Sequence, residues 1–291
     1  MKKKKFRDRR DARRIKVSAM ARLSTYIKDR QDADVYINKK IDITELVKYM
    51  KKKKKDNPDL TFFHAFAIAT AKIIYNRPKL NRYIINHNCY ERNDVILSFV
   101  AKVNFEDDAK EVMSRIVVKD DENIFTLSDT IKEKVNRMRN NIQTSSDDSL
   151  DFLDKFPNWS LKYIIAPGVK WLDRHDLLPR SLNDELLYNS TVILSNLGSI
   201  KCGAIYHNIT NFGTNSILLT IGDIHKEALV MPDGKIEARD VVEFGINLDE
   251  RIADGVYFSK AVNLLEYILK HPETLEGNAN EIIEEKRDFE Y

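Results

Sequence analysis

The segment V-I-L-S-N-L-G at residues 192–198 and the segment D-E-R-I-A-D-G at residues 249–255 decide the fold. The first closes a short apolar run that is typical of a buried strand. The second follows a longer apolar run at 240–248, and another lies at 215–222. P-D-G at 232–234 predicts a hairpin turn. The C-terminal half therefore predicts several strands of a mixed sheet.

Helices and strands are intermixed in the N-terminal half. Residues 35–41 alternate with period two, which predicts a strand. Residues 61–76, T-F-F-H-A-F-A-I-A-T-A-K-I-I-Y-N, are apolar nearly all round and predict a central core helix. Alternation over 95–105 predicts a long half-buried strand, and a further helix is expected to begin at Ser128. This order predicts an α/β fold with one large mixed sheet and helices packed on it.

Charge is distributed unevenly along the chain. Residues 1–17 hold ten Lys and Arg against Asp8 and Asp11, so this basic N-terminal arm carries +8 and the remainder −5 of the net +3. Such an arm can hold nucleic acid, an anionic membrane surface or an acidic patch. No aromatic or motif-bearing module accompanies it, so a solvated terminus is expected and nucleic acid is not an expected partner. Residues 276–291 form an acidic tail that is expected to fray.

Several classes of protein are excluded by composition. No stretch approaches the ~20 apolar residues of a membrane span, and the basic start does not run into an apolar signal core. Cys89 and Cys202 are too few and too isolated for a disulfide framework or a thiolate metal site. The sequence therefore predicts a cytoplasmic protein without a metal.

Three patterns in order carry a resemblance to a known family. P-K-L-N at 78–81 follows the buried helix, and the segments at 192–198 and 249–255 come after it. They resemble the Pro-x-Leu-Asn, Ile-Ser-Asn-Leu-Gly and Asp-His-Arg-x-x-Asp-Gly patterns of the 2-oxoacid dehydrogenase acyltransferase catalytic domain, which has the chloramphenicol acetyltransferase-like fold. The resemblance covers about residues 18–275. Residues 143–190 diverge and predict a helical insertion.

The resemblance implies a homotrimer with active sites at the subunit interfaces. Each site would lie in a channel that coenzyme A enters from one end and the acyl acceptor from the other. By position, Ser195 would donate a hydrogen bond to the oxyanion, and Glu250 takes the place of the catalytic histidine. Asp254 would be structural and pair with an arginine. From the residues themselves, Arg251 and Asp254 are expected to form an ion pair or to belong to one, and Gly255 is expected to permit a tight turn before the last helix.

Glutamate in place of histidine leaves the chemistry open. An unperturbed histidine pKa of about 6.5 suits proton transfer near neutral pH better than a glutamate pKa of about 4.3. An apolar channel can raise the pKa of a carboxyl group by several units. Glu250 is thus either a surviving general base, a salt-bridged structural residue in an altered site, or part of another chemistry. His207, soon after Ser195, is a possible alternative base.

Two functions follow from these patterns. The first is acyl transfer from an acyl-thioester, either acyl-coenzyme A or a lipoyl thioester, to a small thiol or hydroxyl acceptor. The second is a catalytically inactive trimeric scaffold or ligand-binding homologue. No lipoyl module is recognisable, so no covalently bound lipoyl group is expected and a lipoyl or other carrier protein would act in trans.

Overall fold

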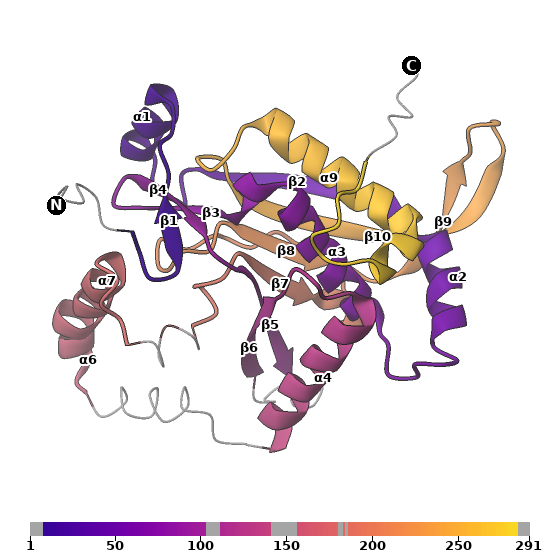
Figure 1. The fold of residues 1–291 in the computed structure, drawn as a ribbon, viewed down its shortest axis with the longest axis horizontal. Helices are drawn as coiled ribbons and strands as arrows, with labels where there is room; N and C mark the ends of the chain where they lie inside the picture. Colours follow the sequence, from indigo (N-terminus) through magenta and orange to yellow (C-terminus); the bar gives the residue numbers. More distant parts are fainter. Residues whose placement is uncertain (1–7, 103–110, 141–155, 180–182, 184–185, 285–291) are drawn as a thin grey trace.

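A mixed sheet carries the fold (Figure 1), which the computed structural model describes over residues 8–102, 111–140, 156–179, 183 and 186–284. β7 runs parallel to β5 and β8, whereas the other neighbouring strands are antiparallel. The strand order is β2 (Asp34–Asp42), β10 (Ile236–Asp249), β8 (Ile217–Ile221), β7 (Val192–Asn196), β5 (Val95–Lys102) and β6 (Glu111–Val118), with β9 (His225–Val230) paired to β10.

A second, small sheet lies beside the N-terminal end of the molecule. It consists of β1 (Ala12–Arg14), β4 (Asn88–Arg92) and β3 (Arg82–Ile85), all antiparallel. The predicted hairpin turn is present between β9 and β10, where Gly234 has a φ of +81°. Glycine reaches this left-handed conformation without strain.

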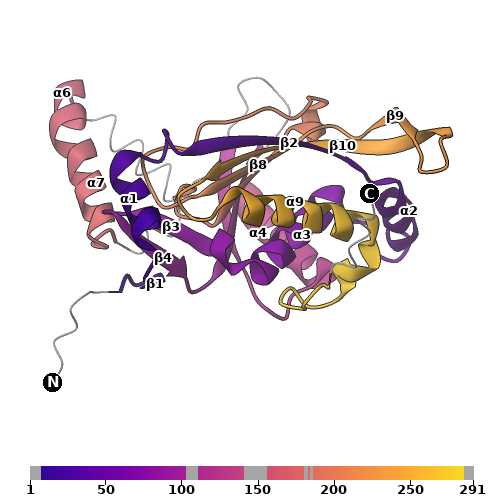
Figure 2. The same cartoon turned by 90° about the horizontal axis from the view of Figure 1, so that it is seen from above.

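Helices gather on one side of the large sheet, as Figure 2 shows for α3, α4 and α9. A π-helical turn, Leu161–Ile165, joins two shorter helices, α6 and α7, at the other end of the molecule from α2. The helices are α1 (Ala19–Ile27), α2 (Thr44–Lys53), α3 (Phe62–Asn76), α4 (Ile124–Asn140), α6 (Asn158–Ser160), α7 (Ala166–Arg174) and α9 (Gly255–Lys270). The predicted α/β class with a large mixed sheet is confirmed.

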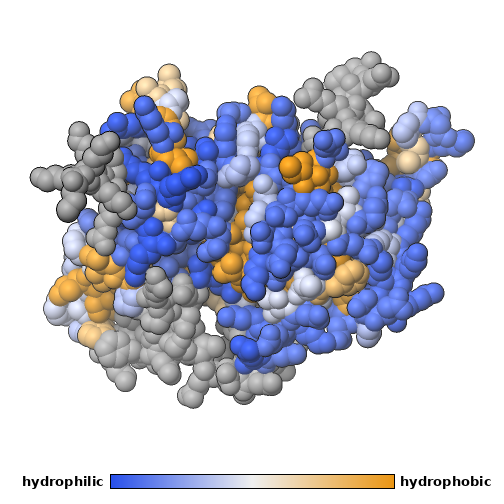
Figure 3. Space-filling model, viewed as in Figure 1, coloured by the Kyte–Doolittle hydropathy of each residue, from blue (hydrophilic) through white to orange (hydrophobic). Residues whose placement is uncertain are grey.

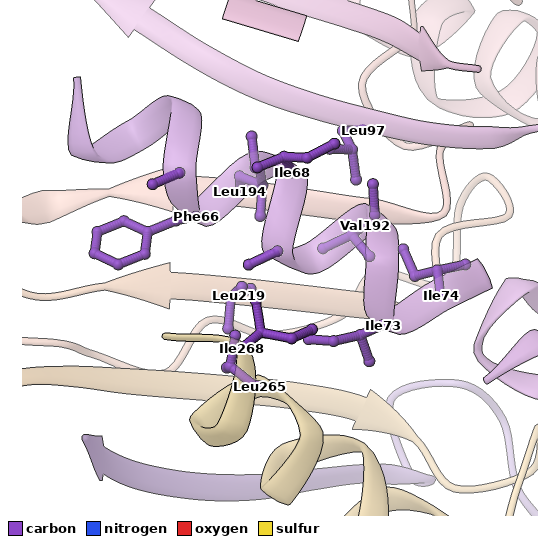
Figure 4. Close-up of a cluster of buried hydrophobic side chains, with 14 of the residues drawn as sticks. Phe66, Ile68, Ile73, Ile74, Leu97, Val192, Leu194, Leu219, Leu265 and Ile268 are labelled. Carbon is purple, nitrogen blue, oxygen red and sulfur yellow. The ribbon is translucent and has the colours of Figure 1, made fainter. Parts of the chain in front are cut away.

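Helix α3 is the central core helix that its all-round apolar sequence predicts. Thr61 caps its start by accepting a hydrogen bond from the backbone N–H of His64, and the His64 ring accepts one from the Thr61 N–H. Its apolar side chains lie over β5, β7 and β8 and against α9 (Figure 4). Phe66, Ile68 and Ile74 are at most 3% exposed. This packing fixes the sheet beneath the site described below.

The predicted start of α4 was wrong by one turn. The helix begins at Ile124 and not at Ser128, because the side chain of Asn123 accepts hydrogen bonds from the backbone N–H groups of Phe125 and Thr126. Asparagine is a favoured helix cap. The strand predicted over 95–105 is β5 up to Lys102, and residues 103–105 lie outside the described part.

The described parts of the N-terminal arm, from residue 8, and of the C-terminal tail, to residue 284, contact the rest of the chain. From Asp8 onward the arm is packed: β1 pairs with β4, and the Arg9 guanidinium donates to the Asp173 carbonyl over 2.9 Å. In the tail, the buried ammonium of Lys72 donates to the Asn278 carbonyl over 2.6 Å. Hydrogen bonds from buried cations to carbonyl groups therefore hold the described parts of the arm and the tail.

The predicted helical insertion over 143–190 is described in part. Residues 156–179 contain α6 and α7, as expected, whereas 143–155, 180–182 and 184–185 lie outside the described residues. No helix within the described ranges is long and apolar enough to cross a membrane. The described residues also contain no group of His, Cys, Asp or Glu arranged to hold a metal ion.

Candidate active site

Glu250 lies in the turn that follows β10. Its backbone N–H donates to the Ala33 carbonyl over 2.9 Å, which ties the turn to the segment ahead of β2. Its carboxylate forms an ion pair with the ammonium of Lys28, the residue that caps the end of α1. The side chains of Glu250 and Lys28 are 41% and 43% exposed. In a single chain, Glu250 is therefore a half-exposed, paired carboxylate and not the lining of an enclosed channel.

The preceding residue, Asp249, is completely buried. Its two carboxylate oxygens accept hydrogen bonds of 2.8 and 2.7 Å from the Arg251 guanidinium, in the two-pronged geometry that arginine favours. The Nε atom of Arg30 lies 3.9 Å from the same carboxylate. Two arginines thus hold the buried charge that begins the motif.

Arg30 connects this carboxylate to the rest of the core. Its guanidinium donates to the carbonyls of Gly213 over 2.8 Å and Ile84 over 3.2 Å. Burial lowers the pKa of Arg30 to about 10, although Asp249 acts in the opposite direction. The segment between α1 and β2 is therefore held from both sides, which fixes the position of Lys28 opposite Glu250.

The ion pair predicted between Arg251 and Asp254 is not the one that forms. Arg251 pairs with Asp249, two residues before it. Asp254 instead caps α9, where its carboxylate accepts a hydrogen bond of 2.9 Å from the backbone N–H of Tyr257. That hydrogen bond to the charged form lowers the pKa of Asp254. Asp254 thus acts as the N-cap of α9.

Gly255 is not required by a tight turn. It is the first residue of α9, its φ is not in the left-handed region, and a Cβ atom built on it would meet open space. The tight turn expected before the last helix therefore does not depend on a left-handed conformation at Gly255. The turn is instead fixed by Asp249 and the Asp254 cap.

Ser195 lies near the end of β7 and faces away from the helices. Its neighbours Val192 and Leu194 belong to the core that contacts α3, and side chains alternate across a strand. Ser195 is half-buried, and none of the described residues hydrogen-bonds its hydroxyl group. The loop that contains Ile205 packs on the same face, where the Ile205 carbonyl accepts a hydrogen bond from the hydroxyl of the neighbouring Thr220, and Ser195 stays partly exposed beside it.

Ser195 and Glu250 are not adjacent within one chain. Ser195 pairs with Thr220 in β8, and Thr220 pairs with Gly245 in β10. Glu250 follows Gly245 by five positions, and five steps along a strand extend about 17 Å. A substrate carbonyl cannot touch both side chains of the same copy at this spacing.

His207 lies between the two along the sheet. Its backbone N–H donates to the side chain of Asn247 over 3.2 Å, and its carbonyl accepts a hydrogen bond from the same side chain. The ring atom Nε2 is buried without a hydrogen bond to any described residue. Asn247 precedes Glu250 by three residues, about 10 Å along the strand. His207 therefore contacts neither Ser195 nor Glu250 through any of these bonds.

Sequence reasoning missed the residues that hold the turn. Lys28, Arg30 and Asp249 were not singled out, although Asp249 opens the quoted motif. An acidic residue at the end of a long apolar strand, with K-D-R in a distant loop, is the signal that was available. It shows which residues are charged but not which of them pair.

The fold is that of the chloramphenicol acetyltransferase-like acyltransferases. A dihydrolipoamide acetyltransferase from Azotobacter vinelandii superposes with a TM-score of 0.61 at 14% identity, covering 93% of this chain and 94% of that chain. A probable dihydrolipoamide acetyltransferase from Listeria monocytogenes gives 0.58 at 17%, covering 89% and 94%. Chloramphenicol acetyltransferase gives 0.50 at 14%, covering 89% and 100%.

The sequence comparison agrees with the fold. Residues 176–276 match the family described as 2-oxoacid dehydrogenases acyltransferase (catalytic domain), so the predicted resemblance is confirmed. The match contains both Ser195 and Glu250. A comparison with curated protein sequences gave no match. The Azotobacter structure was solved to investigate a serine, a histidine and an asparagine in that enzyme's catalytic mechanism, and its histidine and asparagine are four positions apart.

Proposed function

We propose that this protein transfers an acyl group from acyl-coenzyme A to a small thiol or hydroxyl acceptor, at sites shared between neighbouring copies of a homotrimer. The observation that carries the proposal is the separation of Ser195 and Glu250 in one chain: they lie two strands apart, and Glu250 lies about 17 Å further along β10 than Gly245, the residue in register with Ser195. Both side chains fall in the family match, at positions of the motif that the family uses for catalysis. A second copy is needed to bring a serine and a glutamate onto one substrate.

The surface offers apolar groups that suit contacts between copies. The β9–β10 hairpin projects beyond the sheet (Figure 1), and its paired residues Val230 and Ile236 are 73% and 71% exposed. Apolar side chains also gather at the end formed by α1, α6 and α7 (Figure 3), where Met20 is 74% and Tyr163 is 67% exposed. Exposed apolar surface of this kind is typical of association sites.

A cationic cavity beside α1 fits the phosphate groups of coenzyme A. It measures about 600 Å³, and its lining includes Arg14, Lys16 and Arg22 but no acidic residue. Lys28, the partner of Glu250, follows Arg22 by six residues, about 9 Å along a helix. The phosphates would bind to these cations, and the thioester would extend toward Glu250. This arrangement requires no metal.

The mechanism gives each side chain one task. Glu250 accepts the proton of the acceptor's thiol or hydroxyl group as that atom attacks the acyl carbonyl carbon. The hydroxyl of Ser195 from the neighbouring copy donates a hydrogen bond to the oxyanion. As the carbon–sulfur bond breaks, Glu250 returns its proton to the departing thiolate. Lys28 must move away from the Glu250 carboxylate before the first step, because an oxygen that is paired with the lysine ammonium is not free to accept the proton of the acceptor.

The ion pair between Lys28 and Glu250 also favours a second candidate, an inactive trimeric scaffold or ligand-binding homologue. In that case the carboxylate only stabilises the turn, and Ser195 is one more partly exposed polar residue of the sheet. The two candidates differ in one measurable property, which is acyl transfer by the pure protein.

The test is an acyl-transfer assay with acyl-coenzyme A and small thiol and hydroxyl acceptors, repeated with an acylated lipoyl carrier in trans. Glu250→Gln is expected to lower kcat by about 10²-fold or more, because the base is lost. Glu250→His restores the family's residue and is expected to keep activity. Lys260→Ala, on the exposed side of α9, is the control. Full activity in Glu250→Gln would remove Glu250 from the mechanism, and no turnover by the native protein would favour the scaffold.

A further inference from the structure

The insertion segment, residues 156–179, carries exposed aromatic side chains at one end of the molecule (Figure 2). The chain has two tryptophans, Trp159 and Trp171, and they are 61% and 54% exposed. Tyr163 lies between them in the sequence and is 67% exposed. Tryptophan is on average highly buried in folded proteins. Two exposed indole rings in one segment therefore indicate a contact surface.

The exposed side of this segment is positive as well as aromatic. Its exposed charged residues are Lys162, Lys170 and Arg174. Its two acidic residues are not exposed: Asp173 is buried, and Asp176 forms an ion pair with Arg10 over 3.1 Å. The ammonium of Lys162 lies 5.1 Å from the centre of the Tyr163 ring. The surface therefore combines aromatic rings with cations, and its charge is complementary to an anionic partner.

The basic N-terminal arm is attached to the same segment. Arg9 donates to the Asp173 carbonyl over 2.9 Å, and Arg10 donates to the Leu178 carbonyl over 2.7 Å. Residues 2–7 precede this contact and contain five further cations and no acidic residue. The length of the chain alone keeps these cations within about 25 Å of the contact at Arg9. The charge of the arm therefore adds to that of the insertion segment.

We propose that the insertion segment and the basic arm bind the surface of an anionic lipid bilayer. Tryptophan and tyrosine rings favour the level of the lipid headgroups, and clustered lysines and arginines are attracted by anionic lipids. The contact is shallow, with the helices lying in the plane of the interface. The proposal does not rest on acyl transfer, because none of these residues belongs to the proposed catalytic machinery.

Composition favours a lipid surface over a protein or a nucleic acid. Protein–protein interfaces are poor in lysine, whereas most cations of the arm and the insertion segment are lysines. Single-stranded nucleic acids stack their bases on aromatic rings, and the Trp171 ring is already stacked on His175 at 4.4 Å. Ile164 and Leu177 are 59% and 48% exposed, and they add aliphatic surface for acyl chains.

Tryptophan fluorescence of the full-length protein tests the contact without a label, because both tryptophans lie on the proposed surface. Vesicles of phosphatidylcholine and phosphatidylserine are expected to shift the emission to shorter wavelength and to sediment the protein. Brominated lipids in these vesicles are expected to quench the emission. Vesicles of phosphatidylcholine alone should bind much more weakly, because they carry no net charge. No binding to the anionic vesicles, or equal binding to both kinds, would overturn the proposal.

Two variants with the same loss of charge separate the arm from positive charge in general. The first combines Lys2→Gln, Lys3→Gln, Lys4→Gln and Lys5→Gln. The second combines the exposed lysines at the end of α2, Lys51→Gln, Lys52→Gln, Lys54→Gln and Lys55→Gln. The first is expected to weaken binding to anionic vesicles about tenfold or more, because each lysine near the membrane contributes. The second should change little, since α2 lies at the other end of the molecule (Figure 1). Equal losses would contradict the assigned surface.

Tryptophan variants test the aromatic part. Trp159→Ala and Trp171→Ala are each expected to weaken vesicle binding severalfold, because each removes a ring from the interface. Ile282→Ala removes an apolar side chain of the tail that is 83% exposed, and vesicle binding should be unchanged. Other occupants of the surface have their own results. A native oligomer that dissociates in Trp159→Ala would assign the surface to a second copy if no vesicle binds. A single-stranded oligonucleotide that binds where vesicles do not would assign it to nucleic acid. Either result would overturn the lipid assignment.

Discussion

Asp249 and Glu250 are adjacent carboxylates with opposite surroundings. Asp249 is fully buried and held by two arginines, Arg30 and Arg251. Glu250 is 41% exposed and held by one lysine that is itself half-exposed. A buried pair loses much more than an exposed one when a single partner is removed. The first carboxylate therefore anchors the turn, and the second can change without loss of the fold.

This contrast gives a physical reason for the departure at position 250. The turn depends on Asp249, on the Arg30 contacts behind it and on the Asp254 cap after it. No part of that framework requires a histidine at 250. A glutamate can occupy position 250 because Lys28 lies opposite and neutralises its charge. The side chain at this position can therefore change without a change of the fold.

The largest effect is expected for Asp249→Ala. Removing the carboxylate leaves Arg30 buried with its charge uncompensated, and breaking such a pair costs about 3–5 kcal/mol. The free energy of unfolding from urea titration measures this loss. Glu250→Ala is the matched control at the neighbouring position. A similar loss in both variants would show that Asp249 does not stabilise the turn more than Glu250 does, and would contradict the proposed difference between the two carboxylates.

The second effect concerns pH and another buried group, His64. Burial lowers its pKa to about 4 from the ordinary 6.5, so the unfolded chain binds a proton at a pH where the native protein does not. The neutral form of His64 therefore contributes to the free energy of unfolding above about pH 6.5, and this contribution is lost as the pH falls toward 4. It amounts to about 3 kcal/mol.

Urea titrations between pH 7 and 4 measure this dependence. His64→Asn keeps an acceptor near the Thr61 N–H but cannot titrate, so its stability should fall less steeply over the same window. Equal slopes in the native protein and this variant would show that His64 does not titrate as its burial requires.

The smallest effect is expected for Lys28→Met. The ion pair with Glu250 is exposed, and such pairs contribute less than about 1 kcal/mol. Added salt should reduce even this difference, because it screens exposed charges. A loss as large as that of Asp249→Ala would mean that Glu250 is a structural residue, as the scaffold hypothesis states.

Much of the fold could be predicted from sequence because local patterns encode it. The apolar periodicity of 61–76 and of the strands around Ser195 follows directly from side chains that face one core. The order of the tail could not be predicted in this way. Lys72 reaches the Asn278 carbonyl from a residue more than two hundred positions away, and a polar tail has no period that signals such a contact.

The candidate site was predictable only in part for a similar reason. The motif placed Ser195, Glu250 and Asp254 in order, because it is a local signature. The partners of the charged residues come from distant segments: Lys28 and Arg30 from the loop before β2, and Asp249 from the end of β10. A carboxylate partner for Arg251 was expected, but the motif holds three carboxylates beside it, and only the three-dimensional structure shows that Arg251 pairs with Asp249.

The central claim is that Ser195 of one copy and Glu250 of the next form one site, and subunit mixing tests it most directly. Ser195→Ala and Glu250→Gln are each expected to be nearly inactive. If the proposed homotrimer forms, refolding the two variants together at equal amounts would give mixed trimers in which about a quarter of the shared sites carry both native side chains. Acyl-transfer activity should return to about that fraction of the native value. Mixed trimers that form but remain as inactive as the separate variants would contradict a site shared between copies.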